Sequence, residues 1–339
     1  MSAKARRRKL SVEDHIEGVL SGDRMILART ITLVESNHAQ HRHKAQAVLQ
    51  GILSHTGKSH RVGITGVPGV GKSTFIESLG MHLLEEGHRV AVLAVDPTSS
   101  VRGGSILGDK TRMTQLSTDS RAFIRPSPTQ GSLGGVHRKT RETMLLCEAA
   151  GYDVVLVETV GVGQSETAVA DMVDSYLVLM LSGAGDELQG IKKGILEVAD
   201  LITINKADGD NEIRAKRARQ EYARALHFMT TSQTSWKTKV LTCSALKKTG
   251  VPEVWQTLQE HRQCLEEAGE LAEKRKKQRR QWMWSLVEQE LMFRLRQHET
   301  VASLVPELEG QVLAGSTPPT LAAERILEAF GVGTIPPVE

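Results

Sequence analysis

A glycine-rich loop around residue 70 combines the residue types and the spacing that bind phosphate groups. Its glycines let the main chain turn so sharply that several N–H groups can point at one anion. Lys72 can reach the β- and γ-phosphates of a nucleotide, and the Ser73 hydroxyl can bind Mg²⁺. The pattern GxxxxGK[ST] is formed by Gly66, Val67, Pro68, Gly69, Val70, Gly71, Lys72 and Ser73, and Thr74 follows it. We predict that these residues bind nucleotide.

A second motif, Asn205-Lys206-Ala207-Asp208, follows an apolar run, at a position where ligands approach an open α/β sheet. The Asp208 carboxylate can accept hydrogen bonds from both N1–H and the N2 amine of guanine, whereas adenine would leave it unpaired. Ser244 and Ala245 resemble the second guanine-contacting loop of GTPases. The predicted guanine-binding residues are Asn205, Lys206, Asp208, Ser244, Ala245 and Leu246.

Three carboxylates follow apolar runs or glycines and could approach Mg²⁺ directly or through water. Asp96 closes the run 90–95, Asp109 lies between Gly108 and Lys110, and Glu158 ends the run 154–157. Each of them could instead be a solvated loop charge. Glu158 takes the position of the Asp in the usual DxxG motif, and its longer side chain leaves direct or water-mediated contact open. The predicted metal-site residues are Ser73, Asp96, Asp109 and Glu158.

From residue 61 to about residue 245, apolar runs alternate with amphipathic helical patterns. Several runs contain Val, Ile and Leu without a break, which is typical of strands that are buried on both faces. The predicted strands are 62–65, 90–95, 122–124, 154–157, 176–181, 201–204 and 240–242, and the predicted helices include 73–86, 138–150 and 211–226. We predict an α/β fold with a mainly parallel P-loop GTPase sheet and helices on both faces.

The two flanks of this region have helical patterns. We predict an N-terminal helical extension at 1–58, the P-loop G domain at 59–262 and a C-terminal helical region at 263–339. Six Lys and Arg residues crowd into 274–280. Because no recognition motif or aromatic interleaving accompanies them, we interpret this run as an exposed or dimer-flanking helix face and predict no nucleic-acid partner.

Composition and charge limit which partners and cellular locations the sequence supports. The formal net charge of +3 gives no general case for binding nucleic acid or membranes. No apolar run approaches the length of a membrane span, so we predict no membrane partner. The cysteines Cys147, Cys243 and Cys264 form no CxxC motif and no plausible disulfide framework, which favours a reducing, cytoplasmic location.

With these residues in place, the chain closely resembles the MeaB/ArgK/MMAA family of GTPases, and bacterial MeaB most of all. The resemblance weakens in the first 20 residues and beyond about residue 298. The matching stretches are 63–75, 95–99, 103–113, 123–128, 145–153, 157–166, 183–196 and 204–208. Members assist adenosylcobalamin-dependent acyl-CoA mutases, above all methylmalonyl-CoA mutase. The resemblance implies a GTP-dependent chaperone that gates cofactor loading and protects such a mutase.

The resemblance also implies a homodimer, with the C-terminal helical region taking part in dimerisation. It makes Asp96, Asp109 and Glu158 the carboxylates of the magnesium site. Switch I would lie around 99–109, switch II around 161–167, and a third switch that couples to the mutase at 183–193. The signalling positions implied in the third switch are Asp186, Gln189 and Lys192.

Phosphoryl transfer to water needs positioning and charge neutralisation more than covalent chemistry. We assign Lys72 to charge neutralisation and Gln164 to alignment of the water, although Gln164 could equally make a structural hydrogen bond. No arginine finger in the same chain is evident. We therefore expect slow intrinsic hydrolysis that a partner accelerates, with Lys192 supplying part of the missing charge; the alternative for Lys192 is a solvated lysine.

Two other functions stay open beside the mutase chaperone. A nickel metallochaperone GTPase shares the same class of G domain, but it usually needs a Cys/His cluster near the switches. A kinase or ATPase tied to amino-acid transport is opposed by Asp208. The sequence does not name the client mutase, and it contains no DxHxxG cobalamin motif.

Overall fold

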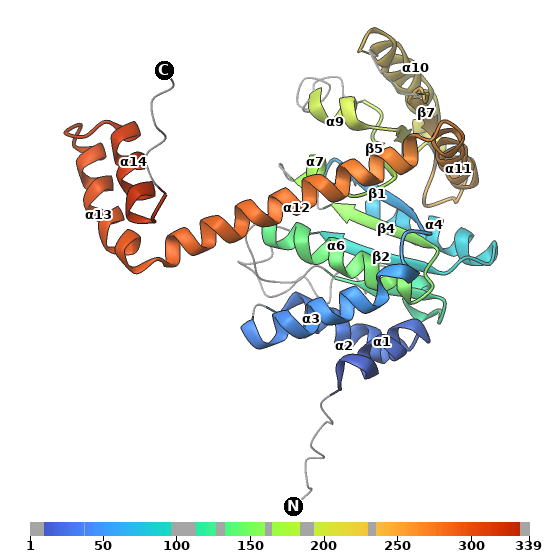
Figure 1. Ribbon diagram of the computed structural model, residues 1–339. Coiled ribbons are helices and arrows are strands. Elements are labelled where there is room, and N and C mark those ends of the chain that lie inside the picture. The colour runs from blue at the N-terminus through green and yellow to red at the C-terminus, as the bar shows by residue number, and fades with distance from the viewer. Residues whose placement is uncertain are drawn as a thin grey trace, which may run out of the picture. The chain divides into compact units, whose positions relative to one another are not determined.

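The computed structural model describes residues 10–36, 38–95, 113–126, 133–159, 165–183, 193–229 and 235–332. At its centre is a sheet in which all described neighbouring strands are parallel (Figure 1). The strands are β1 (His60–Gly66), β2 (Val90–Val95), β3 (Ala122–Arg125), β4 (Val154–Thr159), β5 (Ser175–Met180), β6 (Leu201–Ile204) and β7 (Lys239–Thr242). Their order is β3-β2-β4-β1-β5-β6-β7. The predicted parallel α/β fold is confirmed, and each predicted strand appears within two residues of its bounds.

Helices connect and flank these strands. They are α1 (Val12–Leu20), α2 (Arg24–Glu35), α3 (Ala39–Ile52), α4 (Lys72–Glu85), α6 (Leu133–Ala149), α7 (Ser165–Ala170), α9 (Lys193–Val198), α10 (Glu212–Met229), α11 (Val251–Glu267), α12 (Glu270–Gln297), α13 (Glu299–Leu313) and α14 (Pro319–Ala329). Short 3-10 turns are η1 (Leu53–His55), η2 (Leu116–Thr118) and η3 (Gly209–Asn211). Parallel strands need such crossovers, because the chain must return to the same edge of the sheet before the next strand.

Strand β4 shows how the sheet divides the core into two layers. Val154 and Leu156 join the cluster that packs under α4 and α11, while Val155 and Val157 join the cluster that packs against α6 and α10. Successive side chains of a strand point to opposite faces, so an unbroken apolar run fills both layers. The predicted placement of helices on both faces is confirmed.

The N-terminal helices share the second of these layers. Leu27 and Ile31 of α2 and Val48 and Ile52 of α3 are fully buried in the same cluster as Val155. The capping box at Ser11 starts α1, because the Ser11 hydroxyl accepts from the main chain of the first turn. The three N-terminal helices α1, α2 and α3 are therefore part of the core that supports the sheet.

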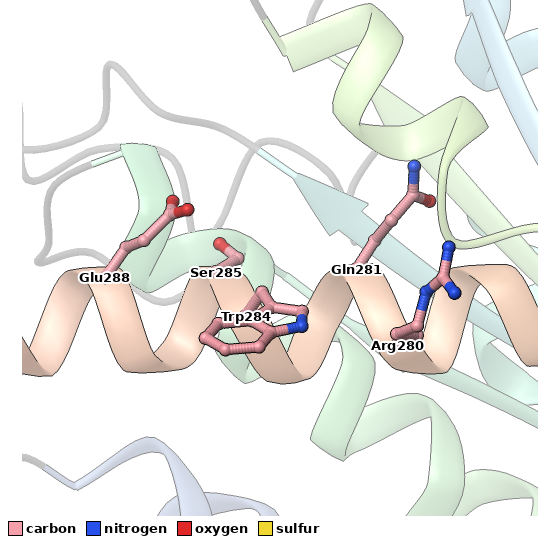
Figure 2. Close-up of a pocket in the computed structure, with 5 residues that line it drawn as sticks. All are labelled: Arg280, Gln281, Trp284, Ser285 and Glu288. Carbon is pink, nitrogen blue, oxygen red and sulfur yellow. The ribbon is translucent and has the colours of Figure 1, made fainter. Parts of the chain in front are cut away.

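By packing, the chain forms two compact units, Met1–Lys276 and Lys277–Glu339. The predicted three-part division stays a prediction. In the second unit, Val301, Leu308 and Ala322 are buried. Helix α12 instead exposes large apolar side chains, namely Met283, Trp284, Val287, Leu291, Met292 and Phe293. Figure 2 shows the side chains along α12 that line a shallow hollow: Arg280, Gln281, Trp284, Ser285 and Glu288.

Buried ion pairs stabilise the edge of the sheet at which the amino ends of the strands lie, called the amino edge below. Asp174 is fully buried, and both its oxygens accept from the Arg275 guanidinium at 2.7 Å. The main-chain N–H of Arg61 donates to the same carboxylate at 2.9 Å. Lys274 donates to the main-chain oxygen of Asp174 at 2.6 Å. Our interpretation of 274–280 as an exposed face is thus wrong at its first two residues, whose charges attach the start of α12 to the sheet.

A chain of buried polar side chains lies beside these ion pairs. The Ser175 hydroxyl stands 2.8 Å from both His60 Nε2 and His261 Nδ1. His261 Nε2 is 3.4 Å from a carboxylate oxygen of Asp200. Although Ser175, His261 and Asp200 have the residue types of a hydrolytic triad, Ser175 is fully buried in the sheet edge. The arrangement therefore satisfies buried polar groups and contributes no nucleophile.

His60 makes the stability of this edge pH-dependent. Burial lowers the pKa of His60 to about 3, although Asp174 favours the charged form. Because an unfolded histidine has a pKa of about 6.5, the unfolded chain binds the proton first as the pH falls. The free energy of unfolding therefore decreases by about 1.4 kcal/mol per pH unit between these two pKa values. Between pH 7.5 and 5.5, urea unfolding should show the wild type losing about 1.4 kcal/mol more than His60→Gln. An equal loss in both proteins would contradict a neutral buried His60.

Candidate nucleotide-binding site

The phosphate loop connects the central strand β1 to the amino end of α4, where free N–H groups and the helix dipole favour anions. At two positions of this loop, a side chain larger than that of glycine would clash with neighbouring residues. A Cβ added at Gly66 (φ +155°) would lie 2.4 Å from the main-chain oxygen of Leu179. Gly71 caps α4 at φ +92°, and a Cβ there would lie 3.1 Å from the amide nitrogen of Asn205. Larger residues at these positions would displace the neighbouring loops.

Lys72 is folded onto its own loop. Its ammonium donates to the main-chain oxygen of Gly66 at 2.8 Å and reaches that of Val67 at 3.5 Å. The positive charge therefore stays beside the glycine-rich turn. A cation held there can neutralise charge on phosphate oxygens that bind the same turn.

Asn205 joins three loops rather than standing alone at the end of β6. Its side chain is buried, and the amide nitrogen donates to the main-chain oxygen of Val70 in the phosphate loop at 2.8 Å. The amide oxygen accepts from the main-chain N–H of Ala245 at 3.1 Å and from Cys243 Sγ at 3.4 Å. The structure thus brings together the phosphate loop and the two predicted guanine loops through one side chain.

Lys206 has a left-handed main chain, with φ +58°. Such a conformation is uncommon for a residue other than glycine, and it is often found at functional sites. The Lys206 ammonium donates to the main-chain oxygen of Gly69 at 2.8 Å. Its aliphatic stem therefore bridges the guanine loop and the phosphate loop and can pack against a flat base between them.

The Asp208 carboxylate is held in place by the other predicted guanine loop. One carboxylate oxygen accepts from the Ser244 hydroxyl, and that hydroxyl also accepts from the main-chain N–H of Lys247 at 3.1 Å. Ser244 is fully buried, Asp208 is partly exposed, and the Leu246 side chain is 74% exposed. A partly exposed carboxylate that is held in this way can read the N–H edge of a purine.

Comparison with known proteins places this site in a family. A profile described as "Methylmalonyl Co-A mutase-associated GTPase MeaB" matches residues 27–300, which include every strand and both nucleotide loops. The chain belongs to the MeaB family of GTPases. The predicted family resemblance is thereby confirmed.

Relatives of this MeaB-family chain match over most of its length. A Caulobacter vibrioides protein named "Putative GTPase" is 53% identical, and the match covers 95% of this chain and 99% of that protein. A Mus musculus protein named "Methylmalonic aciduria type A homolog, mitochondrial" is 48% identical over 92% of this chain and 78% of that protein. A crystal structure described as "LAO/AO transport system kinase" has a TM-score of 0.78 at 39% identity and covers 96% of this chain and 100% of that one.

In this MeaB-family protein, Glu158 lies at the carboxyl end of β4, next to the phosphate-loop strand. It is 8% exposed and pairs in register with Ile64 of β1 and Ala94 of β2. The Ser73 hydroxyl lies 3.5 Å from one of its carboxylate oxygens. The structure therefore brings together two of the four predicted metal-site residues.

The other predicted residues lie outside the described ranges. They are Asp96 and Asp109 of the metal set, Gln164, and Asp186, Gln189 and Lys192 of the third switch. Two residues that the structure places at the guanine loop were not predicted, Asn211 and Ser182. Asn211 follows the motif Asn205-Lys206-Ala207-Asp208 by three residues. Because asparagine side chains in turns often form hydrogen bonds with nearby main chain, its residue type was the signal that could have identified it.

Within the described residues, the cysteines and the possible metal-binding or membrane-spanning segments do not indicate a second functional site. Cys147 and Cys243 are buried, and burial raises the pKa of Cys243 to about 12, so this thiol stays protonated. In the part of the chain that is described, no group of three or more His, Cys, Asp or Glu side chains could hold a metal ion. None of the described helices is both long and apolar enough to cross a membrane.

Proposed function

We propose that this protein is a GTP-binding and GTP-hydrolysing chaperone of an adenosylcobalamin-dependent acyl-CoA mutase, with methylmalonyl-CoA mutase as the first candidate client. It would gate cofactor loading and protect the mutase. The family description names a mutase-associated GTPase, and the mouse relative is named for methylmalonic aciduria; both names support this client. The observation that carries the nucleotide part is Asn205, which holds the phosphate loop and the guanine loops in one array.

Each part of GTP has a matching group in that array. The main chain at 66–73 and the Lys72 ammonium suit the phosphates, because they combine N–H groups with a positive charge at a helix start. The Lys206 stem suits the face of the base. The Asp208 carboxylate suits the N1–H and N2 amine of guanine, and the Ser244 hydroxyl keeps it oriented.

Ser73 and Glu158 fit a magnesium ion that accompanies the nucleotide. A hydroxyl and a carboxylate supply the hard oxygen ligands that Mg²⁺ prefers, and here they approach each other at the phosphate loop. Asp96 and Asp109 complete the proposed ligand set. When bound, the ion neutralises charge on the β- and γ-phosphate oxygens.

For hydrolysis, we assign Lys72 to the charge on the phosphates and Gln164 to the alignment of the attacking water. Phosphoryl transfer would then be accelerated by added positive charge, and we expect intrinsic turnover without the partner to be slow. The mutase would order the third switch, in which Asp186 and Gln189 signal and Lys192 brings part of that charge to the γ-phosphate.

Lys192→Ala should remove most of the stimulation by the mutase and leave intrinsic hydrolysis unchanged. Since a charge supplied on activation contributes a factor of about 10³–10⁵, losing part of it should reduce stimulated turnover by about 10-fold or more. Phosphate release measured with and without mutase gives both rates. Lys216→Ala, on the exposed face of α10, is the matched control because its charge pairs only with Glu212 among the described contacts. Equal stimulation of wild type and Lys192→Ala would remove Lys192 from the mechanism.

We also propose a homodimer in the cytoplasm that uses the C-terminal helical region at 263–339. The large apolar side chains on α12 support such a partner, because burying them in a second copy would remove them from water. Three free cysteines suit a reducing compartment. We propose neither a membrane nor a nucleic acid as a partner.

Co-purification tests the client. The tagged protein, loaded with a non-hydrolysable GTP analogue and magnesium, should retain an adenosylcobalamin-dependent acyl-CoA mutase from an extract of the source cells. An Asp208→Asn variant under the same conditions should retain much less. Retention of a nickel enzyme instead of a mutase, or equal retention by both proteins, would contradict the proposal.

A further inference from the structure

The side chain of Asn211 connects two strand ends that both face the nucleotide site. Its amide nitrogen donates to the main-chain oxygen of Lys206 at 2.7 Å. Its amide oxygen accepts from the Ser182 hydroxyl at 2.5 Å. Asn211 ends η3, immediately before α10, yet both polar atoms of its side chain are used outside that helix. It therefore has more than the ordinary role of an asparagine in a turn.

The hydrogen bond from Asn211 is accepted by Lys206, the residue of the guanine loop that has the left-handed main chain. A left-handed main chain is unfavourable for an L-residue other than glycine, so surrounding contacts must hold it. In this loop, Asn211 fixes the Lys206 carbonyl, and the next N–H, of Ala207, donates to Cys243 at 2.9 Å. Both bonds are made by the one peptide that joins Lys206 to Ala207, and together they fix its orientation one residue before Asp208.

Ser182 provides the fixed point for this contact. It follows β5, whose strand lies between β1 and β6 in the sheet, so the strand cannot shift without moving the phosphate loop. The main-chain N–H of Asn205 donates to Met180 at the end of β5 at 2.8 Å. Ser182 and Asn211 thus add a side-chain tie to a main-chain tie between the same two strand ends.

We propose that Asn211 is a positioning residue for guanine recognition, and that Ser182 acts through it. Asn211 holds the Lys206 peptide in the conformation that aims Asp208 at the base, and Ser182 holds the Asn211 amide. The inference rests on the proposed recognition of guanine by Asp208. It concerns the base and not the phosphates, because neither side chain is hydrogen-bonded to the loop at 66–73 among the described contacts.

Binding of a fluorescent GDP derivative to single and double variants tests this tie. Asn211→Ala should weaken GDP binding by about 10-fold, and Ser182→Ala by about 3-fold, which are the effects of hydrogen bonds of ordinary strength. Asn211→Asp should bind GDP at least as weakly as Asn211→Ala, because it sets a carboxylate against the Lys206 carbonyl. The double variant should bind GDP no more weakly than Asn211→Ala alone, since Ser182 has no other route to the loop.

Two controls separate positioning from a loss of structure. Pyrophosphate binding, measured by displacement, should be the same in all variants, because the phosphate loop is untouched; Asp210→Ala, in the same turn, should bind GDP like the wild type. GDP affinity of Asn211→Ala within twofold of the wild type, multiplied effects in the double variant, or a parallel loss of pyrophosphate binding would each overturn the inference. Wild-type protein that binds ADP as tightly as GDP would instead overturn the proposed function.

Discussion

Replacing Asp208 with asparagine should lower the affinity for GTP and GDP by about 100-fold or more. The carboxylate can accept two hydrogen bonds from guanine, and bonds to a charged group contribute about 1.5–3 kcal/mol each. Asparagine would place an amide N–H₂ or a single oxygen against the same donors. Fold stability should not change, because the Ser244 hydroxyl can donate to the asparagine oxygen as it does to the carboxylate. Titration calorimetry with GDP measures the loss directly.

The same variant should gain affinity for xanthine nucleotides. Xanthine has a carbonyl at the position of the guanine N2 amine, and this carbonyl can accept from the new side-chain amide. Asp210→Asn is the matched control, since it makes the same chemical change in the adjacent turn. Unchanged GDP binding in Asp208→Asn, or an equal loss in Asp210→Asn, would show that Asp208 does not read the base.

Asp174→Ala should reduce the free energy of unfolding by about 3–5 kcal/mol. Arg275 is mostly buried, and removing its partner leaves an uncompensated charge together with the N–H of Arg61. Urea unfolding, followed by circular dichroism, gives the change. Because Asp174 lies at the amino edge of the sheet, away from the nucleotide loops, GDP affinity of the folded variant should be unchanged.

Further variants distinguish a buried pair from a general effect of charge. Glu212→Ala breaks the exposed pair with Lys216 on α10 and should change stability by no more than about 0.5 kcal/mol. Asp174→Ala combined with Arg275→Met should be more stable than Asp174→Ala alone, since the stranded charge is gone. A loss under about 1 kcal/mol in Asp174→Ala would mean that the pair does not hold this edge.

The sheet could be predicted because its signal is local. The runs 90–95 in β2 and 154–157 in β4 are apolar at every position, a pattern typical of strands with both faces covered. The phosphate loop was equally clear, because its glycines, Lys72 and Ser73 stand within eight consecutive residues. Local patterns of this kind need no knowledge of the tertiary structure.

Contacts between residues far apart in sequence could not be predicted. Arg275 meets Asp174 from about a hundred positions away, and in the sequence it appears only as one member of a basic run. His60, Ser175 and His261 come from three separate elements, and their spacing in the sequence does not indicate that they are in contact. Charge alone does not say which side chain turns toward the core, so the exposed interpretation of the basic run failed at Lys274 and Arg275.

The sequence predicted which residues form the nucleotide site but not the hydrogen bonds between them. The types of Asn205, Lys206 and Asp208 indicated a base, whereas the structure shows Asn205 binding Val70 and Ala245 and Lys206 binding Gly69. Such ties depend on the strand order, which places β5 between β1 and β6. Asp96, Asp109, Gln164 and the third switch lie outside the described residues and stay predictions.

Competition between guanine and adenine nucleotides is the most direct test of guanine recognition by this array. The wild-type protein with magnesium is loaded with fluorescent GDP, and unlabelled GDP or ADP is added until the label is displaced. We predict that GDP displaces the label at a concentration about 100-fold or more below that of ADP, because only guanine satisfies the Asp208 carboxylate. Displacement by both nucleotides at the same concentration would contradict it.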